Sequence, residues 1–172
     1  MAGKPPNIFL IGPMGSGKSA VGRSLARHLR VAFHDSDAEI ERRTGVDIPY
    51  IFEKEGEAGF REREREAIAA LTRLRRIVLA TGGGAILLPE NRRLLAENGW
   101  VVYLKTSVAQ QAERVKPGRH RPLLNGVDDT RARLQELTDV RDPLYSAIAD
   151  LTLPTDGRQI KAVVRDIIET IR

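Results

Sequence analysis

The sequence predicts an α/β fold, in which a doubly wound sheet of five parallel strands carries helices on both faces. Short apolar runs at residues 7–11, 31–34, 77–81, 100–104 and 151–153 alternate with longer segments of helical periodicity. The runs show little alternation with polar residues, which is typical of strands covered on both faces. We therefore expect one domain over residues 1–172, with right-handed crossovers and with ligands bound at the carboxyl ends of the strands.

The connecting helices follow from the 3.6-residue period of the apolar positions. They are expected at residues 18–30, 37–43, 56–74, 90–97, 108–115, 129–139 and 159–171. Residues 116–128 interrupt this rhythm, because they contain two prolines, two glycines and three cations. Long loops of this kind are commonly functional, so the segment is predicted to be a mobile lid. The alternative is a surface loop without a role.

The first apolar run leads into residues 12–19, which read Gly-Pro-Met-Gly-Ser-Gly-Lys-Ser and match the phosphate-loop pattern G-x-x-x-x-G-K-[ST]. The glycines allow successive backbone N–H groups to face phosphate oxygens, and the following helix adds its positive end. Lys18 can reach the β- and γ-phosphates, and the Ser19 hydroxyl can ligate Mg²⁺. The pattern therefore predicts a site for ATP and Mg²⁺, and the alternative is a glycine turn that caps a helix.

Two further groups of residues follow later strands. Asp35 and Asp37 come after the second strand, where one carboxylate can hold Mg²⁺ and the other can orient or deprotonate a hydroxyl. An alternative is that one of them caps the next helix. Gly82, Gly83 and Gly84 follow the third strand, where they either bring N–H groups close to a ligand or form a tight turn.

Several cations outside the phosphate loop are candidates for binding anions. Arg61 and Arg141 can each hold a carboxylate through two parallel hydrogen bonds. Lys116, Arg119 and Arg121 belong to the lid segment, where an arginine can stabilise charge on a transferring phosphoryl group. Taken singly, each could equally be a surface charge in a chain this basic.

Composition narrows the function classes. The net charge is +5 and cysteine is absent, so disulfides, thiolate catalysis and zinc–thiolate sites are excluded. The basic balance suits anionic small molecules or nucleic acid, but an aromatic fraction of 5% leaves few platforms for stacking bases. No signal peptide or membrane-spanning run is apparent, and we expect a cytoplasmic protein.

In combination these motifs make the chain similar to the shikimate kinase family over nearly its whole length. The matching pieces, in order, are the phosphate loop, Asp35-Ser36-Asp37, Glu55-Gly56-Glu57 with Phe60-Arg61, Gly82-Gly83-Gly84, Arg121-Pro122-Leu123-Leu124, and Arg141 before Pro143-Leu144-Tyr145. The resemblance implies a P-loop kinase fold like that of nucleoside monophosphate kinases. It also implies transfer of the γ-phosphoryl group of ATP to the 3-hydroxyl of shikimate, a step of aromatic amino acid biosynthesis.

The resemblance also implies a role for individual residues. Lys18, Asp37 and Arg121 would be catalytic, with Arg121 arriving on the lid, while Ser19 and Asp35 would support Mg²⁺. Shikimate would be bound by Asp37, Arg61, Gly82, Gly83, Gly84 and Arg141. ATP would be bound by Gly12, Met14, Gly15, Ser16, Gly17, Lys18, Ser19, Ala20, Arg114, Arg121 and Arg158.

Two alternative functions remain open from the sequence. One is another P-loop small-molecule or nucleoside monophosphate kinase, in which Phe52 or Phe60 would stack on a base. The other is a nucleic-acid-binding, nucleotide-dependent protein, which only the basic charge supports. We expect instead a monomer whose partner is the small molecule shikimate, with neither nucleic acid nor a membrane involved.

Overall fold

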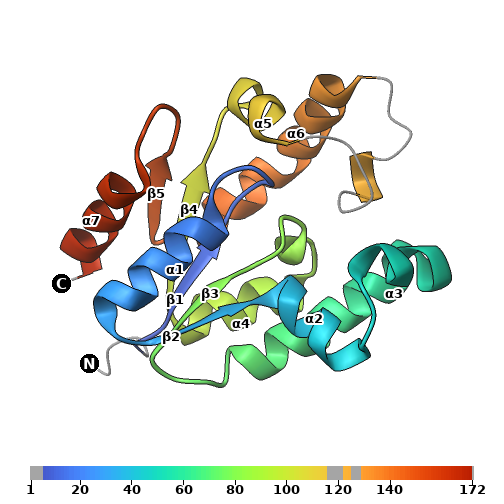
Figure 1. Cartoon of the computed structure of the whole chain (residues 1–172), viewed down its shortest axis with the longest axis horizontal. Helices are drawn as coiled ribbons and strands as arrows, with labels where there is room; N and C mark the ends of the chain where they lie inside the picture. The colour runs from blue at the N-terminus through green and yellow to red at the C-terminus, as the bar shows by residue number, and fades with distance from the viewer. Residues whose placement is uncertain (1–5, 116–121, 125–128, 172) are drawn as a thin grey trace.

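A parallel sheet of five strands, in the order β2-β3-β1-β4-β5, organises the chain (Figure 1). The computed structural model describes residues 6–115, 122–124 and 129–171. The strands are β1 (Ile8–Ile11), β2 (Ala32–Asp35), β3 (Ile77–Ala80), β4 (Trp100–Lys105) and β5 (Leu151–Pro154). Every neighbouring pair is parallel. The predicted α/β class and all five predicted strands are therefore confirmed.

Strand β1 lies in the middle of the sheet, between β3 and β4. After β1 the chain runs to the edge strand β2, returns to β3, and then crosses to β4 on the other side of β1. This reversal of direction leaves a crevice at the carboxyl ends of the strands, where ligands bind in open α/β sheets. The phosphate loop follows β1 and therefore lies at that end.

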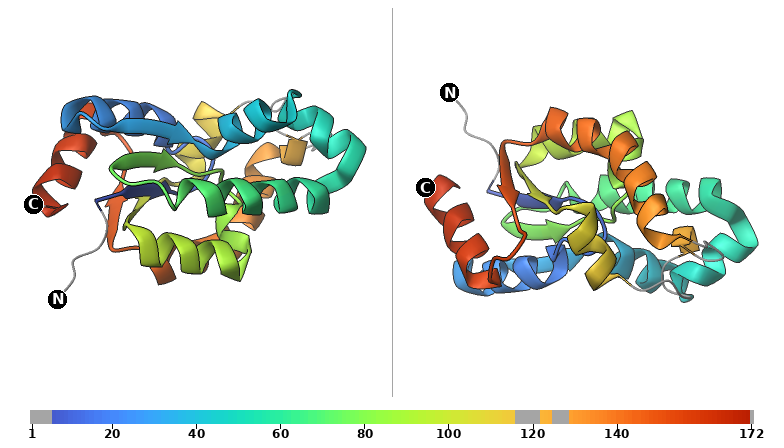
Figure 2. Two further views of the ribbon diagram at one scale, coloured as in Figure 1. Left: turned by 90° about the horizontal axis from the view of Figure 1, so that it is seen from below. Right: turned by 90° about the horizontal axis from the view of Figure 1, so that it is seen from above.

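Helices cover both faces of the sheet (Figure 2). They are α1 (Lys18–Leu29), α2 (Ser36–Thr44), α3 (Ile48–Leu71), α4 (Pro89–Asn98), α5 (Val108–Arg114), α6 (Thr130–Ile148) and α7 (Ile160–Ile171), with short 3-10 helices η1 (Ala85–Leu87) and η2 (Pro122–Leu124). Helices α1 and α7 pack on one face, whereas α3, α4 and α6 contribute to the core on the other.

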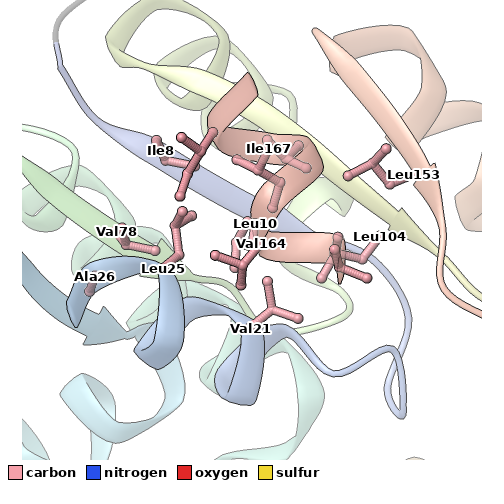
Figure 3. Packing of buried hydrophobic residues seen from close by; sticks show 13 residues of the cluster. Ile8, Leu10, Val21, Leu25, Ala26, Val78, Leu104, Leu153, Val164 and Ile167 are labelled. Atoms are coloured by element: carbon pink, nitrogen blue, oxygen red, sulfur yellow. The ribbon is translucent and has the colours of Figure 1, made fainter. Parts of the chain in front are cut away.

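Successive residues of β1 point to opposite faces, and both faces are buried. Leu10 belongs to the core under α1 and α7, where Figure 3 shows Leu25 and Val164 beside it. Phe9 and Ile11 belong to the core on the opposite face. Burial on both sides explains why this strand reads as a continuous apolar run in the sequence.

Two helices differ from the predicted bounds by more than two residues. Helix α3 begins at Ile48 rather than at residue 56, because the Asp47 side chain caps its first turn and Pro49 lies at the start. Gly56 interrupts this helix with a positive φ of 71°. Helix α6 continues beyond residue 139 to Ile148 and contains Pro143. Burial of Arg141 and Tyr145 in this second half outweighs the hydrogen bond that the proline removes.

The predicted lid falls largely outside the described residues, since only 122–124 and residue 115 before it are described in this region. Within η2, Leu124 is buried against Val115 and Leu134. The mobility of the lid stays a prediction. Within the described part of the chain, no helix has the length and apolar character needed to cross a membrane.

Candidate active site

A cavity of about 340 Å³ opens where the loops after β1, β2 and β3 meet α3 and α6. Thirteen of the residues predicted to form a site line it: Met14, Gly15, Gly17, Lys18, Ser19, Ala20, Asp35, Asp37, Arg61, Gly82, Gly83, Gly84 and Arg141. We call this cavity the candidate pocket. Residues that lie far apart in the sequence are thus brought to one place, at the edge of the sheet that the topology predicts.

The phosphate loop has the backbone that its glycines permit. Gly12, Gly15 and Gly17 all have positive φ values, of 147°, 78° and 87°. A side chain at Gly12 would place its Cβ 2.6 Å from the carbonyl oxygen of Leu104, so the loop approaches β4 too closely for any other residue. Gly17 caps α1 without a side-chain hydrogen bond, and the first turn holds no acidic residue. The N–H groups at the start of a helix point away from it, so this turn suits an anion.

Lys18 and Ser19 make different contacts at the mouth of this loop. Lys18 Nζ donates hydrogen bonds to the carbonyl oxygens of Gly12 at 2.6 Å and Pro13 at 2.7 Å. The ammonium group is therefore held at the loop, in reach of phosphates that the loop would bind. Ser19 Oγ donates to Asp35 Oδ2 at 3.0 Å, which joins the end of β2 to the start of α1.

Asp35 combines two of the roles considered for it. Its Oδ1 atom accepts hydrogen bonds from the backbone N–H groups of Asp37 at 2.9 Å and Ala38 at 3.2 Å, so it caps α2. Its other oxygen faces the Ser19 hydroxyl. A hydroxyl and a carboxylate oxygen at this distance are ligands of the kind that Mg²⁺ prefers, directly or through water. The residues present therefore fit a magnesium ion held mainly by phosphates and water.

Asp37 lies in the pocket beside a second carboxylate, that of Glu64. A Cβ built on Gly82 would be 2.9 Å from both Asp37 Oδ1 and Glu64 Oε2, so the two acids lie over the same glycine. Both oxygens are buried and have no hydrogen-bond partner among the described residues. Burial, followed by the charges of Glu64 and Asp35, raises the pKa of Asp37 to about 7, against the opposing effect of Lys18 and Arg61.

Glu64 is a site residue that the sequence did not single out. It belongs to the run at 61–66, in which arginines and glutamates alternate, a pattern typical of a solvated helix face. One face of this helical run points into the protein: Glu64 lies one turn after Arg61 and is fully buried. Burial raises the pKa of Glu64, while Arg61 opposes that effect. The spacing of three between Arg61 and Glu64 was the available signal.

Two arginines face the glycine turn from different helices. Arg61 of α3 donates from Nη1 to Glu64 Oε1 at 2.9 Å, and its Nη2 lies 3.3 Å from Glu57 Oε1. Arg141 of α6 is 4% exposed, and its Nη1 lies 3.4 Å from the position of a Cβ on Gly83. Burial and the charge of Arg61 lower the pKa of Arg141. The pocket therefore has a cationic end at the glycine turn.

The remaining predicted residues lie elsewhere. Gly12 and Ser16 form part of the loop without lining the pocket, and Arg114 Nη1 donates to the Gly15 carbonyl at 3.0 Å from outside it. Arg158 pairs with Asp166 at 2.6 Å. Arg121 lies outside the described residues. Contacts of Arg114, Arg121 and Arg158 with a nucleotide stay predictions.

Comparison with known proteins tests the family suggested by the motifs. A family model described as "Shikimate kinase" matches residues 14–172. The chain belongs to the shikimate kinase family. The match begins inside the phosphate loop and includes the other residues that line the pocket. The resemblance inferred from the sequence is therefore confirmed.

Individual relatives agree with this assignment over nearly their full lengths. The shikimate kinase of Thioalkalivibrio sulfidiphilus is 58% identical over 161 residues, covering 94% of this chain and 84% of the relative. The shikimate kinase of Mannheimia succiniciproducens is 53% identical over 165 residues, covering 96% and 94%. A structure of shikimate kinase from Acinetobacter baumannii in complex with shikimate has a TM-score of 0.94 and 48% identity, with 97% and 93% covered. The predicted P-loop kinase fold is confirmed by this agreement.

Proposed function

We propose that this protein transfers the γ-phosphoryl group of ATP to the 3-hydroxyl of shikimate, giving ADP and shikimate 3-phosphate. One observation carries the proposal: a single pocket joins a phosphate loop, a buried carboxylate and two arginines. This set of groups suits a reaction in which an anionic acceptor presents a hydroxyl to a bound triphosphate. The family assignment and the relative in complex with shikimate support the same acceptor.

The phosphate loop and Lys18 bind and orient the triphosphate. N–H groups of the loop and of the first turn of α1 receive the phosphate oxygens, while the ammonium of Lys18 contacts the β- and γ-phosphates. Ser19 and Asp35 are the residues that would hold Mg²⁺. The bound ion would neutralise charge on the β- and γ-phosphates.

The opposite end of the pocket binds the acceptor. Arg61 and Arg141 hold its carboxylate, and N–H groups of the Gly82–84 turn receive further oxygen atoms. Asp37 accepts a hydrogen bond from the attacking hydroxyl and then takes its proton as the new P–O bond forms and the bond to the ADP oxygen breaks. Because the transition state of phosphoryl transfer is loose, positioning and charge stabilisation supply most of the rate enhancement.

Further parts of the proposal rest on the sequence. Residues 1–172 form one domain, and residues 116–128 form a lid that brings Arg121 onto the phosphates. Arg114 and Arg158 contact the nucleotide at its outer edge. The enzyme is a cytoplasmic monomer that acts without nucleic acid or membrane partners.

A coupled assay of ADP formation with a panel of acceptors tests the function. The panel contains shikimate, gluconate and nucleoside monophosphates, each with ATP and Mg²⁺. We expect turnover with shikimate and only background rates with the others. Comparable or faster turnover of gluconate or a nucleotide would contradict the proposed acceptor while leaving the kinase fold intact.

Replacing either pocket arginine should separate the two substrates. We expect Arg61→Ala and Arg141→Ala to raise the KM for shikimate by about 10- to 100-fold, since each loses hydrogen bonds to a charged group. The KM for ATP should change little, because neither residue contacts the phosphate loop in the described contacts. Arg65→Ala is the matched control, since Arg65 is on the same helix but pairs with Glu62 and Glu90 outside the pocket. Parallel increases in both KM values would argue against a carboxylate clamp.

A further inference from the structure

Tyr145 lies behind the glycine turn and is 2% exposed. Its hydroxyl donates a hydrogen bond to the carbonyl oxygen of Gly83. Arg141 lies one turn earlier on α6 and lines a second small cavity together with Tyr145. Gly83 and Arg141 line the candidate pocket, whereas Tyr145 does not. One buried hydroxyl therefore holds the glycine turn at the cationic end of the pocket from outside the pocket.

The bond to Gly83 fixes the direction of a backbone N–H group. The described chain contains no cis peptide bond, so the carbonyl of Gly83 and the N–H of Gly84 point in opposite directions. Since the carbonyl points away from the pocket to Tyr145, the N–H of Gly84 is directed to the pocket side. Glycine residues offer little resistance to rotation of this peptide. The Ala85 N–H group closes the turn on the Gly82 carbonyl at 3.1 Å, and Tyr145 supplies a second anchor from another element.

Arg141, which lies beside Tyr145, differs from Arg61 in its charged neighbours. Arg61 is compensated by Glu64 and Glu57, but among the described residues no carboxylate lies within ion-pair distance of Arg141. A buried cation without a counter-ion is unfavourable, and the neutral hydroxyl of Tyr145 nearby does not cancel its charge. The full charge of Arg141 is therefore available to an anionic ligand.

The ring of Tyr145 is itself held in place. It packs against Tyr103 with ring centroids 4.8 Å apart, within the core between β4 and α6. Tyr103 donates its own hydroxyl to Asp142 Oδ1 at 2.7 Å and makes no contact with the glycine turn among the described hydrogen bonds. The two tyrosines thus share a packing environment but differ in what their hydroxyls hold.

We propose that Tyr145 is a positioning residue of the acceptor site, whose hydroxyl sets the orientation of the Gly84 N–H group toward the carboxylate end of the acceptor, beside the guanidinium group of Arg141. This inference rests on the proposed function, because the acceptor is taken to be a hydroxylated carboxylic acid. Tyr145 acts through the carbonyl of Gly83 and does not touch the reacting atoms.

The decisive comparison is between Tyr145→Phe and Tyr103→Phe, each of which removes one hydroxyl from the same aromatic pair. Tyr145→Phe is expected to raise the KM and dissociation constant for shikimate about tenfold, as loss of an ordered hydrogen-bond anchor predicts. The KM for ATP should stay close to the parent value. Tyr103→Phe should leave both KM values near the parent. Equal effects of the two variants, or an unchanged KM for shikimate in Tyr145→Phe, would overturn the proposal.

A binding measurement with a modified acceptor isolates the carboxylate. An analogue of shikimate that carries a hydroxymethyl group in place of the carboxylate should bind the parent and Tyr145→Phe with similar, weak affinity. A loss of affinity for this analogue as large as that for shikimate would indicate general damage to the pocket and would contradict the proposed role. Turnover of shikimate by the parent enzyme is checked first, so failure of the proposed function is distinguished from failure of this inference.

A measurement on the parent protein covers the case in which Tyr145→Phe does not fold. The chain has three tyrosines, so protein labelled with 3-fluorotyrosine gives three ¹⁹F signals. Tyr50→Phe and Tyr103→Phe identify two of them, and Tyr145 is the third. We expect the Tyr145 signal to shift when shikimate is added and to stay unchanged with the carboxylate-free analogue. A Tyr145 signal that does not respond to shikimate would refute the proposal.

Discussion

Asp37→Asn is expected to reduce turnover by about 10²- to 10⁴-fold, the range found for positioned acid–base groups, while ATP binding stays close to that of the parent. The side chain keeps its size and can still hydrogen-bond a hydroxyl, but it can no longer take up the proton. Its raised pKa, of about 7, places a proton acceptor near neutrality at the point where the phosphate loop and the arginines meet. Turnover within about tenfold of the parent would contradict this role.

The structure also predicts that this inactive variant is more stable than the parent without ligands. Asp37 Oδ1 and Glu64 Oε2 are both buried without partners and lie over Gly82, so an amide at position 37 can donate to the glutamate. The pKa of Asp37 is higher in the folded protein than its ordinary value of 3.8. Protonation therefore stabilises the folded parent at low pH, and this contribution is lost as the pH rises from about 4 to about 7.

Thermal unfolding across this pH range measures the effect. The difference in melting temperature between Asp37→Asn and the parent should grow as the pH rises from about 4 to about 7 and then level off. Asp139→Asn is the matched control, since Asp139 is exposed on α6 and accepts a hydrogen bond from Gln135. A melting-temperature difference that stays constant over the whole pH range would contradict a raised pKa of the buried Asp37 carboxyl. Such a trade-off between stability and activity is common at functional sites.

The sequence predicts the scaffold well because its signals are local. The strands are apolar runs buried on both faces, and the phosphate loop is a pattern whose glycines have the positive φ values that the turn requires. Asp35 has both of the roles that the sequence allows, since one of its oxygens caps α2 and the other faces Ser19. Local chemistry allowed both roles, and the two oxygens serve them separately.

The features that could not be predicted from the sequence depend on contacts between distant segments. Glu64 reads as one more charge in an alternating run, and only packing of α3 against the glycine turn buries it. Tyr145 was noted as part of a motif, but its partner Gly83 comes from another element 62 positions earlier. Helix α6 continues nine residues beyond its predicted end at residue 139, because tertiary packing of this half, which contains Pro143, overrides helix propensity. Side-chain orientation across elements is therefore the part that required the structure.

Lys18→Met should abolish activity because the variant uses ATP poorly. We expect kcat/KM for ATP to fall by at least about 10²-fold, as for loss of one electrostatic donor at a transition state. The ammonium already contacts the carbonyls of Gly12 and Pro13 within the loop, so it needs little rearrangement to meet a phosphate. Methionine keeps the length of the side chain but has no charge and no donor. Circular dichroism and melting temperature should show a folded protein.

The affinities of nucleotides for Lys18→Met then locate the lost contact. Because Lys18 is proposed to contact the β- and γ-phosphates, ATP and ADP should bind more weakly to the variant, whereas AMP should lose little. Lys105→Met is the matched control, since Lys105 lies at the end of β4 and is 3.8 Å from Asp142 on the surface. Shikimate affinity should survive in Lys18→Met, and nucleotide affinity should survive in Asp37→Asn. If both variants lost both ligands, the pocket could not be divided into a phosphate end and an acceptor end.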